Sequence, residues 1–145
     1  MLKSFWFWFF ITFIAIQFVP MAVPLNIVET KGSTIEAPKK VLDTLKRACY
    51  DCHSNNVELP WYDTIAPASW YVKNHIADGR QVVNFSKWNE YTKEKQLKVL
   101  EKLPKSIVIR MPIPSYLWLH QEAKLSKKER SFLKKWAEEL KDSIK

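Results

Sequence analysis

Two cysteines and a histidine lie within five consecutive residues, Cys49-Tyr50-Asp51-Cys52-His53. Thiols three residues apart on a helix are about one turn apart, and this separation suits addition to the two vinyl groups on one edge of a haem. The adjacent His53 can then ligate the iron as the proximal ligand. Cys-x-x-Cys-His is the attachment sequence of c-type haem. The motif therefore predicts one covalently attached haem c.

Other uses of these residues require different surroundings. A thioredoxin-like dithiol needs a strand before the cysteine pair, but the residues before Cys49 have a helical apolar period. A zinc site needs four ligands, and His75 and His120 lie too far apart for the usual paired spacing. A chance motif without a cofactor is the third alternative. We favour haem because the chain also begins like an exported protein, and c-type haem is attached beyond the membrane.

The second axial ligand of such an iron is usually methionine or histidine. Met111 is favoured because Pro112 and Pro114 stiffen the loop that would hold its thioether. His75, His120 and an open or water-bound position are the alternatives. The predicted haem-binding residues are Cys49, Cys52, His53 and Met111, of which His53 and Met111 ligate the metal.

An apolar run extends from Phe5 to Leu25 and is interrupted only by Thr12 and Gln17. About 20 residues are needed to cross the hydrocarbon core as a helix, and bulky rings on every face argue against a buried core helix. An uncleaved membrane anchor is favoured over a cleaved signal peptide, because residues 21–24 form a poor cleavage site. Lys3 before the run keeps the N-terminus in the cytoplasm, so the rest of the chain is expected outside.

The composition predicts an all-α fold, since only two glycines and eight prolines favour helices joined by stiff loops. Four helices are expected: from about Pro38 to Asp51, from Ala68 to Val83, from Thr92 to Leu103 with Pro104 as its stop, and from Ser126 onward. The last begins with a capping box, Ser126-Lys127-Lys128-Glu129. The expected organisation is an anchor or signal over 1–25, a tether over 26–37 and a haem-binding domain over 38–145.

The chain is basic, with a formal net charge of +8. This charge favours an acidic redox partner or anionic lipid headgroups, although an ordinary solvated helix face accounts for it equally well. The lysines are spread along the chain, so nucleic acid is not an expected partner. Six basic residues lie near or on the last predicted helix: Lys124, Lys127, Lys128, Arg130, Lys134 and Lys135.

Several short motifs are spread over residues 38–140. They are the segments 49–55, Trp61-Tyr62, 65–70, Asp78-Gly79-Arg80, 84–88, Met111-Pro112, Pro114-Ser115-Tyr116, Leu119-His120, Glu122-Ala123 and Leu125-Ser126. With these motifs the chain resembles a bacterial family, the haem-binding domain family of small exported c-type cytochromes. The resemblance implies a mostly helical, cytochrome-c-like domain behind one apolar segment. It also implies haem binding at the Cys-x-x-Cys-His residues and a second axial ligand in the Met-Pro region. The family usually has proline after the residue matching His120, where this chain has Gln121.

An iron with two protein ligands has no vacant site for substrate, so it exchanges electrons but does not readily activate oxygen. The expected function is therefore single-electron transfer by a non-enzymatic carrier, on the periplasmic side of the bacterial inner membrane. The alternative is a haem-based sensor or peroxidase-like enzyme with an open sixth position, in which His75 or Arg80 would be the distal polar group. A third reading is a binding module that uses haem only as a structural core.

Overall fold

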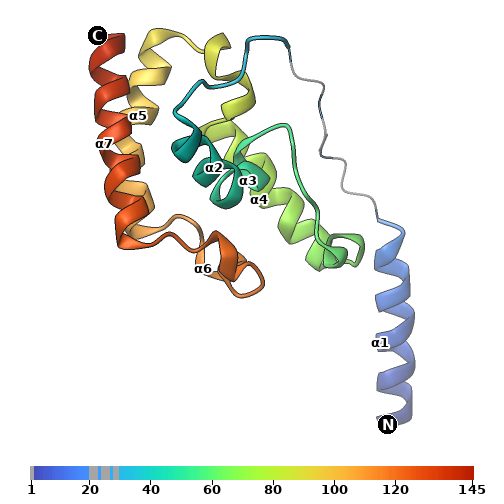
Figure 1. The fold of residues 1–145 in the computed structure, drawn as a ribbon. Coiled ribbons are helices and arrows are strands. Elements are labelled where there is room, and N and C mark those ends of the chain that lie inside the picture. Colours follow the sequence, from blue (N-terminus) through green and yellow to red (C-terminus); the bar gives the residue numbers. More distant parts are fainter. Residues whose placement is uncertain (1, 20–22, 24–26, 28–29) are drawn as a thin grey trace.

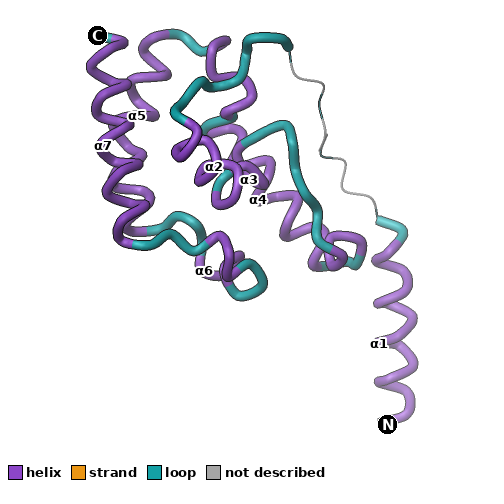
Figure 2. Tube along the Cα trace, viewed as in Figure 1, coloured by secondary structure: helices purple, strands orange, loops and turns teal. Residues whose placement is uncertain are grey.

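The computed structural model describes residues 2–19, 23, 27 and 30–145. Within these residues all regular secondary structure is helical and no strand is present, which confirms the all-α prediction (Figures 1 and 2). The α-helices are α1 (Leu2–Gln17), α2 (Lys39–Ala48), α3 (Tyr50–His53), α4 (Ala68–Val82), α5 (Lys93–Ile109), α6 (Pro114–Leu117) and α7 (Lys127–Ile144). Three 3₁₀ helices lie between them, η1 (Trp61–Thr64), η2 (Phe85–Glu90) and η3 (Gln121–Ala123). The four predicted helices correspond to α2 with α3, α4, α5 and α7, and the other short elements were not predicted.

The first predicted helix is broken at Cys49. Its backbone has φ −132° and ψ −32°, which ends α2, and α3 begins at the next residue. The helical direction is nearly kept, because Cys49 N–H still donates to the Leu45 carbonyl at 2.8 Å. Val41 and Leu45 bury one side of α2 against the core. The break therefore lies at the end of a helix that is fixed against the core, and Cys49 itself packs there.

The prediction that Pro104 stops the third helix was wrong, because α5 continues through it to Ile109. A proline inside a helix loses one backbone hydrogen bond and costs about 3 kcal/mol. Ile107, beyond the proline, is buried in the core, and burial of such a side chain contributes about 1.5–3 kcal/mol. Figure 1 shows α5 and α7 antiparallel and side by side, so packing along α7 keeps the last turn of α5 helical.

The predicted start of α7 is confirmed. Ser126 accepts a hydrogen bond from Glu129 N–H, and the Glu129 carboxylate accepts one from Ser126 N–H at 2.8 Å. Leu133, Trp136 and Ala137 on one side of α7 are buried and form an apolar stripe. The cap and the stripe together fix both the start of α7 and the side it presents to the core.

α1 stands away from the other helices, and only its C-terminal end is near them (Figure 1). It has 16 residues, and none of the helices in the described part of the chain is both long and apolar enough to cross a membrane. The predicted apolar run over 5–25 includes positions 20–22, 24 and 25, and the predicted tether includes 26, 28 and 29. All of these lie outside the described residues.

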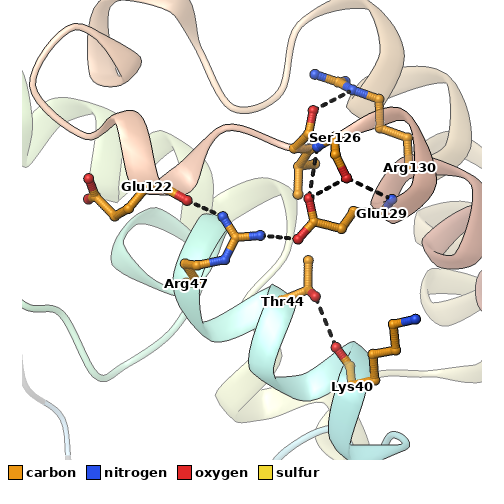
Figure 3. A network of polar contacts seen from close by, with 8 residues as sticks. Lys40, Thr44, Arg47, Glu122, Ser126, Glu129 and Arg130 are labelled. Carbon is orange, nitrogen blue, oxygen red and sulfur yellow. Dashed lines mark hydrogen bonds and ion pairs between the residues drawn. The ribbon is translucent and has the colours of Figure 1, made fainter.

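An arginine of α2 connects that helix to the start of α7 (Figure 3). Arg47 donates to the Glu122 backbone carbonyl and to the Glu129 carboxylate. The pKa of Glu129 is held below its ordinary value, first by the Ser126 N–H and then by the Ser126 hydroxyl and Arg47. Since only 26% of the Glu129 side chain is exposed, this carboxylate should stabilise the contact between α2 and α7.

Replacing Glu129 with glutamine should lower the free energy of unfolding at pH 7 by about 1 kcal/mol, because the ion pair is lost while the capping oxygen stays. The folded pKa of Glu129 lies below its ordinary value of 4.5. Its contribution is therefore complete above that value and disappears as the pH falls through the folded pKa. Urea unfolding of both proteins between neutral and acidic pH measures the difference.

Glu138→Gln is the matched control, since the exposed pair of Glu138 with Lys134 spans 3.9 Å on the same helix. It should change the free energy of unfolding by no more than about 0.3 kcal/mol. An equal effect of the two variants at pH 7, or a Glu129→Gln effect that does not depend on pH, would contradict the proposed contact.

Candidate functional site

The two cysteines are free and partly buried at the junction of α2 and α3. Burial raises the pKa of the Cys49 thiol to about 12, with the nearby Cys52 as the second cause. Burial and then the Asp51 carboxylate raise the pKa of Cys52 to about 11. Redox-active dithiols have a lowered thiol pKa, so these protonated cysteines do not fit the thioredoxin-like alternative.

The His53 ring is oriented by the C-terminal end of α4. Its Nδ1 lies 2.9 Å from the Gly79 carbonyl oxygen and 3.1 Å from that of Val83. Carbonyl oxygens only accept, so Nδ1 carries the proton and Nε2 carries the lone pair in the neutral ring. Burial lowers the pKa of His53, and the two backbone bonds oppose this. A neutral imidazole whose other nitrogen donates to a carbonyl is the usual form of a metal-ligating histidine.

Gly79 permits this arrangement. A Cβ atom at Gly79 would lie 2.5 Å from the Cys52 carbonyl oxygen and 3.1 Å from the Cys52 Cβ. No side chain fits there, so the backbone of α4 meets the backbone of α3 directly. This close approach explains a glycine inside a helix, where it ordinarily costs about 1 kcal/mol.

Buried polar side chains hold the segment that follows His53. Asn84 Nδ2 donates to Asn55 Oδ1 at 2.8 Å, and Asn55 N–H donates to Ser86 Oγ at 3.0 Å. Arg80 Nε donates to the Ser54 carbonyl at 2.8 Å. Because buried polar groups are costly without partners, this network permits only one register between residues 54–55 and 84–86.

An aromatic residue of the same segment supports the His53 ring. Phe85 is buried, with its ring stacked on Tyr50 at 5.9 Å between centroids and at 63° to the His53 ring at 6.2 Å. Phe85 therefore limits rotation of the imidazole on one side.

A hollow opens beside Cys52, and we call it the Cys52 hollow. Its walls come from the segment after α3, from η1, from α4 and from the residues around the start of α6. The lining residues are Asp51, Cys52, Val57, Glu58, Leu59, Pro60, Tyr62, Tyr71, Val72, His75, Ile76, Ile113 and Tyr116. Most of this lining is aliphatic or aromatic, as in cofactor sites. Of the three motif residues Cys49, Cys52 and His53, Cys52 lines the hollow and the other two do not. Two thiols followed by an imidazole are nevertheless the residue types that a haem c site requires.

The candidates for the second axial ligand occupy different places. Met111 directly follows the end of α5, and its N–H donates to the Ser106 carbonyl at 2.9 Å. Met111 does not line the Cys52 hollow, although Ile113 of the same loop does. His75 lines the hollow, with Nδ1 held 2.9 Å from the Tyr71 carbonyl, so its Nε2 carries the lone pair in the neutral ring.

His120 has partners for both ring nitrogens. Its Nε2 lies 2.8 Å from the Tyr62 hydroxyl, and its Nδ1 lies 3.0 Å from the Glu122 carboxylate. The structure thus brings Cys49, Cys52 and His53 together, places His75 at the hollow and assigns local bonds to His120. The choice of Met111 as second axial ligand stays a prediction.

The sequence analysis missed a contact between the haem motif and α6. The Tyr116 hydroxyl donates to Asp51 Oδ2 at 2.5 Å, and burial followed by this bond raises the Tyr116 pKa. The Tyr116 ring stacks on His120 at 4.2 Å. Asp51 lies inside the Cys-x-x-Cys-His motif, but no spacing rule relates it to a tyrosine 65 residues away.

The zinc alternative has no support in the described part of the chain, where no group of three or more His, Cys, Asp or Glu side chains could hold a metal ion.

A family model described as a haem-binding domain matches residues 11–139. No curated protein and no solved structure matches the chain. The family match agrees with the donor set that the geometry defines.

Replacing Gly79 with alanine tests the close contact of α3 and α4. The same change in an unobstructed helix interior stabilises a protein by up to about 1 kcal/mol. Here the new Cβ meets backbone, so we expect a loss of about 1–3 kcal/mol in the free energy of unfolding. Urea unfolding of the purified protein measures it. Asp78→Ala, at an exposed neighbour on α4, is the control and should stay within about 0.5 kcal/mol. A Gly79→Ala variant as stable as the parent would refute the contact.

Proposed function

The chain belongs to the haem-binding domain family, and on that premise we propose that it carries one haem c and exchanges single electrons at the periplasmic face of the inner membrane. Cys49 and Cys52 would hold the haem by two thioether bonds, and His53 Nε2 would ligate its iron. The observation that carries the proposal is the His53 ring, whose Nδ1 is bonded to two backbone carbonyls.

The bound haem supplies a one-electron redox couple. The chain determines how that couple behaves. The Gly79 and Val83 carbonyls orient the imidazole and increase the basicity of Nε2. Leu59, Ile76 and Ile113 give the hollow an aliphatic wall that limits water, and solvent access is one of the properties that tune a haem potential.

We propose Met111 as the second axial ligand. The loop that begins at Met111 already supplies Ile113 and Tyr116 to the Cys52 hollow, and Tyr116 is bonded to Asp51 inside the motif. The loop is thus fixed beside the attachment site. Methionine ligation raises the potential of a haem relative to two histidines, which suits a carrier rather than an oxygen-activating site.

The exposed residues of α1 support the proposed location. Its large apolar side chains are exposed, among them Phe7 and Trp8 at 58% and 61%. Moving each such side chain out of water contributes about 1.5–3 kcal/mol, so we propose that α1 embeds in the bilayer and that the haem domain lies outside it.

We further propose an acidic redox protein as the partner. Two of the six basic residues near α7 pair on the helix itself, Lys134 with Glu138 and Lys135 with Glu139. Such exposed pairs are weak, so they leave the basic surface available to a stronger acidic partner.

Covalent attachment is tested by a haem stain after denaturing electrophoresis and by a pyridine haemochrome spectrum. Protein exported by a host with cytochrome maturation should stain, and the Cys49→Ala/Cys52→Ala variant should not. Met111→Leu is the control and should keep its stain, because it leaves both thiols in place. A colourless parent protein, or a double variant that still stains, would refute attachment at these cysteines.

The sixth ligand is tested by carbon monoxide binding to the reduced protein, followed by absorption. The parent should be six-coordinate and bind carbon monoxide slowly, because a ligand must first leave the iron. Met111→Ala should bind it at once, whereas His75→Ala and His120→Ala should behave like the parent. Rapid binding in His75→Ala alone would reassign the ligand to His75. Rapid binding by the parent would favour the sensor or peroxidase-like alternative.

A further inference from the structure

Gln17, near the C-terminal end of α1, forms hydrogen bonds with the haem domain. Gln17 Nε2 donates to the Ala66 carbonyl at 3.1 Å, and Ala66 N–H donates to Gln17 Oε1 at 2.9 Å. The Trp70 indole N–H donates to the Val19 carbonyl at 3.2 Å. These bonds determine where the apolar helix leaves the domain: at the junction of η1 and α4.

Exposed apolar side chains surround this exit point. Trp61 is 77% exposed, and Ile65 and Leu59 are each 40% exposed. We name the surface formed by Leu59, Trp61, Ile65 and Trp70 the η1–α4 corner. It adjoins the end of α1, because Trp70 is bonded to Val19 and Ile65 directly precedes Ala66, the partner of Gln17.

We propose that the η1–α4 corner rests on the headgroup region of a lipid bilayer around the emerging α1. This inference rests on the proposed membrane attachment and adds the face and orientation of the domain. Tryptophan favours the membrane interface, where its ring is in an apolar setting and its N–H is bonded. The Ala66 backbone groups are already paired with Gln17, so lipid can approach without leaving them unsatisfied.

The orientation has a consequence for the haem site. Leu59 belongs to the corner and also lines the Cys52 hollow, together with Pro60 and Tyr62. Tyr71, another lining residue, directly follows Trp70. The proposed orientation would therefore bring this part of the hollow's lining close to the headgroups.

Hydroxyl-radical oxidation of the full-length haem protein in phosphatidylcholine–phosphatidylglycerol vesicles tests the proposal. Trp118 is the internal control, because it is 79% exposed, close to the 77% of Trp61, but follows α6. Peptide mass spectrometry should show Trp61 oxidised at least about threefold more slowly than Trp118, owing to its place in the interface. Equal rates would overturn the proposal.

Two aspartate substitutions give a matched comparison. Ile65→Asp should raise the oxidation of Trp61 towards that of Trp118, since a carboxylate is repelled by the anionic surface. Leu119→Asp, at a position 65% exposed beside Trp118, should leave Trp61 protected. Loss of Trp61 protection when more lipid is added per protein would indicate a second copy of the chain as the covering partner and would refute the lipid contact.

Flotation of the vesicles and a haem stain of the same sample separate the possible failures. Protein that floats and stains but shows equal oxidation refutes only the seating of the corner. Protein that stains but does not float refutes the membrane attachment and the seating together. Protein that floats without a stain and still protects Trp61 supports the seating and refutes the haem proposal.

Discussion

The site depends on one backbone contact, the approach of α4 to α3 at Gly79. Because Gly79 has no side chain, its carbonyl can reach His53 Nδ1 while its Cα lies against Cys52. A larger residue would separate the helices and move the acceptor away from the imidazole. The position of a single glycine thus places one of the two carbonyls that bond His53 Nδ1 and sets how closely the Cys52 backbone approaches α4. Haem ligation by His53, as proposed, requires both.

Buried polar side chains beside the contact of α3 with α4 make its register specific. Asn55, Asn84 and Ser86 are buried and bonded to one another, and a shift of register would leave their polar groups without partners at a cost of about 1–3 kcal/mol each. The apolar core formed by α2, α5 and α7 would tolerate small shifts more readily, because apolar contacts are not directional. The core therefore brings the helices together, while the polar network beside His53 selects one arrangement.

The sequence was sufficient where the determinants are local. The capping box at Ser126 predicted the start of α7 correctly, and the cysteine–histidine motif supplies three of the proposed site residues. It failed where tertiary packing overrides a local preference: Pro104 lies inside α5 because Ile107 beyond it is buried. It also gave no pairing between Asp51 and Tyr116. Such contacts depend on how distant segments meet, and no periodicity within a single helix contains that information.

α4 takes part in three of the contacts on which the proposals depend. Trp70 near the start of α4 binds the end of α1, Tyr71 and His75 line the Cys52 hollow, and Gly79 near its end holds His53. These residues lie along one helix, so in the proposed arrangement α4 connects the end of α1 to the haem site. If the domain lies on the bilayer as proposed, it would present its haem to the lipid surface in one orientation. That arrangement favours electron exchange with partners held at the same membrane over partners that diffuse freely.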